Sequence, residues 1–397
     1  MTRLGDVCEK IGSGATPRGG KEAYKDAGIP IIRSQNIHDW VFQPDGLAFL
    51  DDEQAESLSN VEVRSNDVLL NITGDSVARA CIVPSERIPA RVNQHVAIVR
   101  AGKEINPTYL LASLQSKKTM LLSLASSGAT RNALTKRMIE NLDIDLPSRE
   151  IQDSIAQVLD SIQYKITLNN RLNDYLFELV SSVFAHRFSD NVNTTELKNV
   201  LSISTKALKP QEHADEIWEH YSIPAFDEKH RPIFEPASGI KSNKYQIDSE
   251  CILISKLNPS TKRIWMPCCS SNNAVCSTEF IVYRPYLKEY KSFYYAAIDS
   301  PRFTDYLLEH VSGSTGSRQR AQPKDTLNYL MPNPDNEEIK DFCIFADPIY
   351  RHIQINEQQT AKLELLRETL LPKLMSGTID VSKVDLTQLT NNHLADC

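Results

Sequence analysis

The sequence lacks the long apolar segments of a membrane protein. No apolar run approaches the roughly 20 residues that a membrane span requires. The opening residues, MTRLGDVCEK, contain no apolar core of a secretory signal. Both absences predict a cytoplasmic protein with no membrane association.

Cysteine is present but follows no pattern. The eight cysteines form no CxxC pair and no regular framework, which predicts reduced and mostly buried thiols instead of a disulfide scaffold. Cys268, Cys269 and Cys276 have neither a second metal-spaced pair nor a nearby histidine. Ordinary packing is therefore favoured over a zinc site.

Motifs for catalysis are absent as well. No GxG fingerprint for S-adenosylmethionine follows a convincing strand. The segment NPTY, Asn106 to Tyr109, is similar to a methyltransferase base-holding motif, yet an N-cap asparagine followed by proline explains it. Asp335, Glu338 and Lys340 contain the residue types of a nuclease site, but they lie too close together at an acidic helix start. The sequence therefore predicts no catalytic group and no metal site.

Basic residues are not in excess, because the formal charge is −7 and the isoelectric point is near 5.8. This balance excludes a uniformly basic nucleic-acid coat. It leaves local basic surfaces open, because binding depends on the patch and not on the sum. The length of 397 residues exceeds one ordinary core and predicts roughly two or three domains.

What the sequence does contain is an internal repeat. Residues 158–184 align without a gap on residues 345–371, and the offset is constant, since 347 − 160 and 366 − 179 both equal 187. Upstream, SSGATRNALTKRMIENLDIDLP and VSGSTGSRQRAQPKDTLNYLMP share a small-residue turn, basic residues and an apolar run that ends in proline. The chain is therefore predicted to be two tandem copies of one unit.

Each copy ends in a long amphipathic pattern. Apolar residues, Leu172 and Leu179 among them, recur mostly every three or four positions from Ile151 to Val183 and from Phe342 to Leu374, which predicts coiled-coil packing through these positions. We expect helices within 148–190 and 335–381 that pack as an antiparallel coiled coil, the first a spacer roughly 55–60 Å long. Pro348 predicts a bend, or the helix start itself, near that point. A buried helical hairpin inside one globular domain is the alternative.

The body of each copy is predicted to be mixed. Short β-like runs such as NDVLLNIT in the first copy and ECILISKL in the second alternate with Gly, Pro, Asn and Ser turns. The predicted fold class is α/β (mixed), with two tandem pseudo-symmetric copies, each a strand-rich domain followed by its long helix. The expected bounds are 1–147 for the first domain, 191–334 for the second and 382–397 for a C-terminal tail.

Basic charge gathers in the turns that precede the long helices. From Lys117 to Ile139, and from Val311 to Lys324, every charged side chain is basic. Such turns suit phosphate contact and base-edge readout. A solvated turn is the alternative for one copy, but equivalent turns in both copies favour a nucleic-acid face.

The candidate DNA-binding residues are basic or amide side chains of these turns and of neighbouring loops, because arginine suits guanine and asparagine or glutamine suits adenine. In the first copy they are Thr16, Arg18, Arg33, Gln35, Asn36, Lys117, Arg131, Lys136 and Arg137. In the second copy they are Lys206, Lys209, Lys256, Lys262, Arg263, Arg318, Arg320 and Lys324.

Taken together, these parts resemble the DNA-specificity subunit of a type I restriction-modification enzyme. The resemblance rests on LGDVCEKIGSGATPRGG near the start, SSGATRNALTKRMIENLDIDLP before the first long helix and IAQVLDSIQYKITLNNRLNDYL within it. It extends to about residue 381. The second copy departs from it, because LSISTKALKPQEH lacks the Gly-x-Thr-Pro loop of Gly14 to Pro17.

The resemblance implies a non-catalytic subunit with two target recognition domains, each reading one half of a split sequence in double-stranded DNA. It implies that the two helices carry two methyltransferase subunits that bind S-adenosylmethionine, and that motor-nuclease restriction subunits using ATP and Mg join for cleavage. A coiled-coil scaffold without direct DNA readout is the alternative. The candidate partner-binding residues are Ile162, Ile166, Asn169, Leu176, Ile349, Ile353, Asn356 and Leu363.

Overall fold

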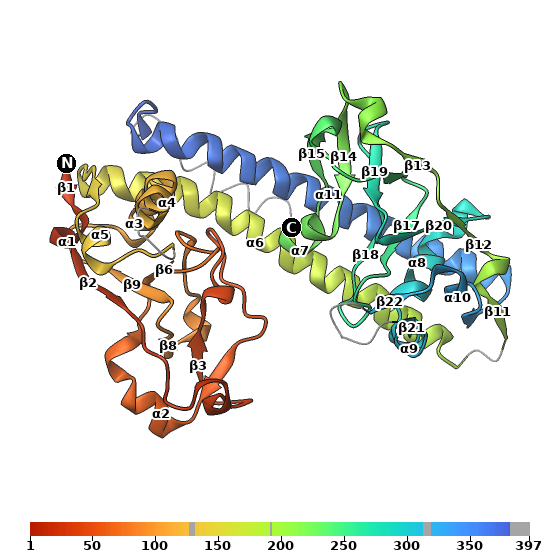
Figure 1. Cartoon of the computed structure of the whole chain (residues 1–397), viewed down its shortest axis with the longest axis horizontal. Coiled ribbons are helices and arrows are strands. Elements are labelled where there is room, and N and C mark those ends of the chain that lie inside the picture. The colour runs from red at the N-terminus through yellow and green to blue at the C-terminus, as the bar shows by residue number, and fades with distance from the viewer. Residues whose placement is uncertain (127–131, 191–192, 313–318, 382–397) are drawn as a thin grey trace. The chain divides into compact units, whose positions relative to one another are not determined.

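The computed structural model describes residues 1–126, 132–190, 193–312 and 319–381 (Figure 1). The chain divides into two compact units: unit 1 comprises Met1–Thr167 and Ala361–Cys397, and unit 2 comprises Leu168–Thr360. The division falls inside both long helices, so each unit contains one strand-rich domain together with part of each helix. Arg131, Arg318 and the tail 382–397 lie outside the described residues.

Unit 1 contains two four-stranded sheets. One is antiparallel in the order β2-β9-β6-β7, and the other has the order β4-β3-β8-β5 with β3 and β8 parallel. A further pair joins β1 to β10. The strands are β1 Thr2–Arg3, β2 Cys8–Ser13, β3 Ile29–Ile32, β4 Ala48–Leu50, β5 Glu62–Val63, β6 Val68–Asn71, β7 Ala80–Ile82, β8 Ala90–Val92, β9 Val96–Ala101 and β10 Asp143–Ile144. The helices are α1 Leu4–Val7, α2 Asp52–Ser57, α3 Pro107–Ser116, α4 Lys118–Ser126 and α5 Lys136–Glu140.

The position of β6 between two packed layers explains why its sequence, VLLN, does not alternate between apolar and polar residues. Val68 and Leu70 belong to the cluster that packs on α3, whereas Leu69 belongs to the cluster between the two sheets. Because successive side chains of a strand point to opposite faces, a strand covered on both faces needs apolar residues at every position. This sheet therefore forms the middle layer of unit 1.

Unit 2 repeats this plan. Its two larger sheets have the orders β12-β20-β17-β18 and β13-β16-β19-β14-β15, with β14 and β19 parallel, so β13 is an additional edge strand; β11 pairs with β23, and β21 with β22. The middle layer recurs, since Ile252 and Ile254 face the helices and Leu253 faces the second sheet. The strands are β11 Thr194–Glu196, β12 Leu201–Ser204, β13 Ala207–Leu208, β14 Ile217–Tyr221, β15 Ile233–Pro236, β16 Lys244–Gln246, β17 Ile252–Ser255, β18 Ile264–Trp265, β19 Ala274–Ser277, β20 Phe280–Pro285, β21 Val311–Ser312, β22 Arg320–Ala321 and β23 Leu330–Pro332. The helices are α7 Ile223–Lys229, α8 Lys291–Asp299, α9 Pro301–Glu309 and α10 Pro323–Thr326.

The two long helices are α6, Arg149–Phe188, and α11, Asn336–Met375. Both predicted helices are confirmed. The acidic start of α11 is a capping box, because Glu338 N donates to Asp335 Oδ1 at 2.9 Å and Asp335 N donates to Glu338 Oε2 at 3.2 Å. The helix does not begin at Pro348, as the sequence allowed, because α11 already starts at Asn336. No helix in the described parts of the chain is long and apolar enough to cross a membrane.

In both units the helices pack against each other. In unit 1, Ile155, Leu159 and Ile162 of α6 share a core with Leu371 and Leu374 of α11. In unit 2, successive α6 residues meet α11 residues in descending order, as an antiparallel pair requires: the pairs are Asn169 with Gln359, Asn173 with Asn356, Phe177 with Tyr350 and Phe184 with Phe342. The predicted antiparallel coiled coil is therefore confirmed.

Amide side chains interrupt the apolar helix interface of unit 2. Asn356 Nδ2 donates to Asn173 Oδ1 at 2.8 Å, and Asn169 Nδ2 donates to Gln359 Oε1 at 3.0 Å. Asn169, Asn173 and Asn356 are buried. A buried amide keeps its hydrogen bonds in one alignment only, so this layer favours a single register of the two helices.

Candidate nucleic-acid interface

Three loops meet where β6 ends and β9 begins, in the middle sheet of unit 1. Ile72 N donates to His95 O at 3.0 Å, and Leu134 N donates to Ile72 O at 2.8 Å. Gly74 N reaches Asn132 O at 3.3 Å, and an isolated bridge pairs Thr73 with Ala133. These bonds attach the end of the predicted basic turn to the loops after β6 and before β9. We call the residues 72–74, 95 and 132–134 junction 1.

The same arrangement occurs in unit 2. Lys256 N donates to Glu279 O, Ala321 N donates to Lys256 O and Asn258 N donates to Gln319 O, each at 2.9 Å. The bridge from Leu257 to Arg320 completes the set. We call the residues 256–258, 279 and 319–321 junction 2.

The two junctions correspond position by position. The offset is 184 for the loop residues, since 256 − 72 and 279 − 95 agree, and 187 for the turn, since 319 − 132 and 321 − 134 agree. Gly74 and Asn258 both have positive φ, at 77° and 51°. Glycine and asparagine are the residues that tolerate this backbone conformation. The duplication seen in the helices therefore extends to the loops that hold the basic turns.

Junction 1 presents neutral polar groups. Thr73 Oγ1 lies 2.7 Å from Nδ1 of His95, and the exposed Gln94 is adjacent to that imidazole. Thr73, Gln94 and His95 were not among the residues predicted from the sequence. Their signal was a pair of polar turns, NITGDS and VNQH, which only the fold brings together.

Junction 2 presents charged groups. Arg320 Nε donates to Glu279 Oε2 at 3.1 Å, and Nη2 approaches Oε1 at 3.4 Å. The side chains are 45% and 31% exposed, so both remain in contact with water. Of the candidates from the second copy, Lys256 and Arg320 are brought together here, and Glu279 is the partner that the sequence did not indicate.

Three other candidates of the second copy lie in separate ion pairs. Arg263 is bidentate to Asp227 at 2.6 and 2.9 Å with only 11% of its side chain exposed, so the prediction that it contacts DNA is not supported by its position. Lys262 pairs with Asp299 at 2.7 Å and Lys209 with Glu212 at 2.9 Å. Lys206 and Lys324 are exposed.

In the first copy, the candidate residues that follow β3 donate hydrogen bonds to nearby backbone carbonyl groups. Arg33 Nη2 and Gln35 Nε2 both donate to Gly46 O. Asn36 is fully buried, and its Nδ2 donates to Gln43 O at 2.9 Å and Asp45 O at 3.1 Å. The prediction that Asn36 reads a base is corrected, because a buried amide whose hydrogen bonds hold its own loop cannot reach a groove.

The remaining candidates of the first copy are dispersed. Arg18 and Arg137 are exposed, and Thr16 and Lys117 are half-buried. Lys136 is exposed and pairs with Glu140 at 3.4 Å within α5. Arg131 lies outside the described residues, although its neighbour Asn132 is in junction 1.

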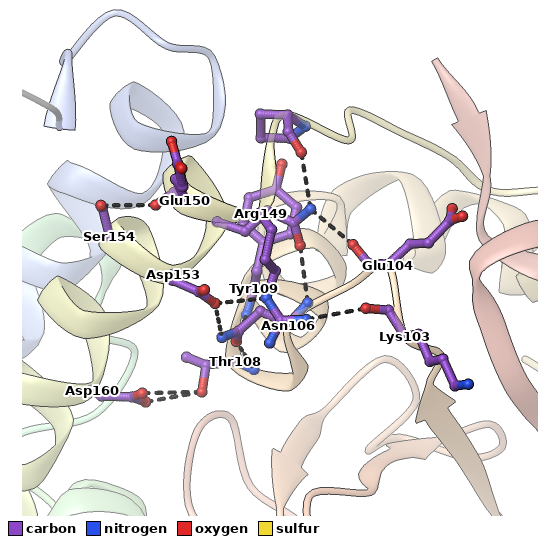
Figure 2. A network of polar contacts seen from close by, with 12 residues as sticks. Lys103, Glu104, Asn106, Thr108, Tyr109, Arg149, Glu150, Asp153, Ser154 and Asp160 are labelled. Carbon is purple, nitrogen blue, oxygen red and sulfur yellow. Dashed lines mark hydrogen bonds and ion pairs between the residues drawn. The ribbon is translucent and has the colours of Figure 1, made fainter.

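The segment NPTY is structural, as its sequence context predicted. Asn106 caps α3, because its Oδ1 accepts from Thr108 N at 2.8 Å and Tyr109 N at 3.2 Å. Its Nδ2 donates to Asp153 Oδ1 at 2.7 Å, and Thr108 Oγ1 donates to Asp160 at 3.1 Å (Figure 2). This network attaches α3 to α6 and leaves no amide available to hold a base.

The long helices correct the predicted partner-binding surface. Ile162, Ile166, Asn169, Ile353 and Asn356 are each at most 7% exposed. They contact the other helix, so they are not available to a partner. The other three candidates are half-buried: Leu176, Ile349 and Leu363.

A second row of apolar side chains on α6 is exposed to solvent. Leu168, Leu172, Tyr175 and Leu179 are 40%, 37%, 67% and 45% exposed, at spacings of four, three and four residues. Leu172 and Leu179 were expected in the helix interface, and their exposure corrects that prediction. We call these four residues the outer stripe.

Two cysteine thiols in the interior have raised pKa values. Burial raises the pKa of Cys8 to about 12 and that of Cys251 to about 11, so both thiols are protonated at neutral pH. Within the residues described, no group of three or more His, Cys, Asp or Glu side chains could hold a metal ion.

The fold is similar to that of a protein of known structure. The S subunit of a type I restriction-modification system from M. genitalium superposes with a TM-score of 0.58 at 14% identity, over 94% of this chain and 95% of that one. The HsdS subunit from Thermoanaerobacter tengcongensis aligns over 95% of this chain and 96% of that one, with 18% identity and a TM-score of 0.36.

Two sequence comparisons each match less than half of this chain. The MjaX type I restriction enzyme specificity subunit of Methanocaldococcus jannaschii is 23% identical over 178 residues, which are 43% of this chain and only 41% of that protein. Residues 1–176 match the family model of the type I restriction modification DNA specificity domain. This match confirms, for residues 1–176, the resemblance that the sequence shows.

Proposed function

We propose that this chain reads a bipartite sequence in double-stranded DNA, with junction 1 contacting one half-site and junction 2 the other. The observation that carries the proposal is the correspondence of the junctions. Six backbone hydrogen bonds, three in each unit, hold three loops in equivalent positions. A duplicated reading surface is what a two-part target requires, in the way that paired modules of other DNA-binding proteins each contact one half-site.

The chemistry of the junctions supports the same function. Hydroxyl, imidazole and amide groups in junction 1 and a guanidinium with a lysine in junction 2 are groups that contact base edges and phosphates. The family of residues 1–176 supports it independently, because its members are DNA specificity domains.

The outer stripe is proposed as the docking site for a methyltransferase subunit. Its four side chains repeat with the spacing of a coiled-coil seam, and the interior seam of α6 is already covered by α11. Exposed apolar residues at such spacing mark surfaces for another protein. Two methyltransferase subunits would bind S-adenosylmethionine, and restriction subunits would use ATP and Mg to cleave DNA, while this chain contributes specificity and no catalytic group.

The decisive experiment isolates the full-length chain from its host extract and identifies bound proteins by mass spectrometry. The complex is then given S-adenosylmethionine and a library of random-sequence duplexes, and methylated adenines are mapped. We expect a methyltransferase to co-purify and the methylated sequences to share two half-sites with a fixed gap.

Two variants assign the surfaces. Leu168→Asp with Tyr175→Asp should abolish methyltransferase recovery, whereas Glu178→Gln, an exposed change on the same helix, should leave it unchanged. Recovery of the chain alone, together with no salt-sensitive DNA binding, would support the coiled-coil scaffold instead.

A further inference from the structure

The two junctions have equivalent backbones but different side chains, and two of the differing positions carry the inference made here. Ala133 of junction 1 corresponds to Arg320 of junction 2, since 320 − 133 equals 187. His95 corresponds to Glu279, since 279 − 95 equals 184. A methyl group and an imidazole in unit 1 thus stand where unit 2 has an arginine and a carboxylate.

The position of Arg320 is fixed from two sides. Its backbone pairs with Ser312 of β21 and forms the bridge to Leu257. Glu279, which precedes β20, accepts hydrogen bonds from Nε and Nη2 of the guanidinium. The carboxylate engages the side edge of the guanidinium, so it sets the direction of the end formed by the two Nη groups.

An arginine held in this way has the geometry for one particular base. Arginine binds N7 and O6 of guanine with two parallel hydrogen bonds in the major groove, a pattern that no other base pair presents. A side chain with many rotamers loses more entropy on binding than one that is already oriented. The Glu279 contact therefore favours a specific base contact over a diffuse phosphate contact.

We infer that Arg320, positioned by Glu279, reads a guanine in the half-site recognised by unit 2. Unit 1 has Ala133 and the hydrogen-bonded Thr73–His95 pair at the equivalent place, so its half-site does not depend on this contact. Arg320 is a specificity-determining residue, and Glu279 is its positioning residue. The inference rests on the proposed function, because it identifies the base read by one of the two junctions.

The test uses the full-length chain in complex with its methyltransferase partner and selects bound duplexes from a random library at fixed salt. The wild type should select two half-sites, one of which contains a guanine. Arg320→Lys keeps the positive charge but cannot form the bidentate contact. It should reduce the preference for that guanine at least about five-fold, the lower end of what such a contact contributes, and leave the other half-site unchanged.

Three further variants separate specificity from charge. Glu279→Gln should relax the same guanine position while overall DNA binding persists. Lys324→Ala, an exposed lysine in the following α10, should weaken all sequences equally and change no base frequency. His95→Ala should alter only the half-site that Arg320→Lys leaves intact.

Two results overturn the inference while leaving the proposed function in place. One is that Arg320→Lys selects the wild-type sequences with unchanged base frequencies. The other is that the position it relaxes is not a guanine. A wild-type complex that selects no sequence at all overturns the proposed function itself.

Discussion

Units 1 and 2 share a framework and differ in chemistry. Their two larger sheets have the same strand order, apart from the extra β13, and each unit contains one parallel pair at the equivalent place. The junction loops are held by the same backbone hydrogen bonds. Because backbone donors and acceptors are independent of residue type, the side chains at the junctions can differ without moving the loops that carry them. The shared backbone sets where the junction loops lie, and the side chains set which chemical groups those loops expose.

The attachment of each domain to its long helix shows a second difference. In unit 1, the first turn of α3 is held by Thr108 to Asp160 and by the amide network around Asn106 (Figure 2). In unit 2, Ser292 in the first turn of α8 donates to Asp347, the repeat equivalent of Asp160. Unit 2 adds a cluster of phenylalanine rings between its domain and its helices. The shared element is one hydroxyl–carboxylate hydrogen bond.

The largest effect is expected from breaking the core of one unit at matched positions. Phe342 and Ile155 are repeat equivalents, since 342 − 155 equals 187, and both are buried. Phe342→Ala removes ring contacts to Phe184 and Phe293 at 5.6 and 5.9 Å. It should lower the free energy of unfolding by about 4 kcal/mol, and Ile155→Ala by about 3 kcal/mol.

Denaturant unfolding of the full-length chain measures both changes. Leu179→Ala, in the outer stripe, is the surface control and should change the free energy by less than about 0.5 kcal/mol. Equal losses for Leu179→Ala and Phe342→Ala would contradict the packing of the two helices described for unit 2.

A smaller effect is expected from pH, through Glu357 of the second copy. Burial raises the pKa of Glu357 from 4.5 to about 7, whereas the repeat-equivalent position carries the non-titrating Asn170. Between these two pH values the folded state keeps a proton that the unfolded state releases. The contribution of Glu357 to the free energy of unfolding is therefore complete below pH 4.5 and is lost as the pH rises to about 7. Glu357→Gln should remove that loss.

Thermal unfolding at two pH values tests the direction of this pH dependence. Glu357→Gln should be more stable than wild type by about 1–2 kcal/mol at pH 8, a discounted figure because water screens part of the burial cost. The difference should vanish near pH 4. His230 lies 3.6 Å from Glu357 with its pKa lowered by burial to about 4, and its contribution has the opposite sign. A variant less stable than wild type at pH 8 would contradict the expected direction.

The smallest effect is expected from the shared attachment. Thr108→Ala and Ser292→Ala each remove the hydroxyl donor to an equivalent aspartate, and each should cost about 1 kcal/mol. Thr108→Ser keeps the hydroxyl and should cost less than Thr108→Ala. Chemical denaturation of the four proteins, wild type included, gives the comparison. A loss for one site and none for the other would show that the two domains are attached differently.

The sequence predicted the elements that depend on local chemistry. The constant offset of 187 revealed the duplication, and the apolar spacing predicted both long helices. The N-cap role of Asn106 also followed from its neighbours, because an asparagine before proline has one dominant use at a helix start. These features are set by residues that are close in the chain.

Contacts between distant residues were not predictable in the same way. The periodicity of α6 identified apolar positions but not which of them α11 covers, so Leu172 and Leu179 were assigned to the wrong face. Asn36 has the residue type of a base reader, yet the fold buries it under its own loop. Side-chain chemistry does not reveal whether a polar group is consumed internally.

The sequence by itself determined that this protein is a repeated α/β domain with two long helices, because periodicity and capping are local properties of the chain. Only the tertiary structure decided which residues form the candidate reading surfaces. Junctions 1 and 2 each join three loops that are far apart in the sequence, and backbone hydrogen bonds with no residue signature hold them together. The pairing of Arg320 with Glu279, 41 residues apart, appears only once that folding is complete.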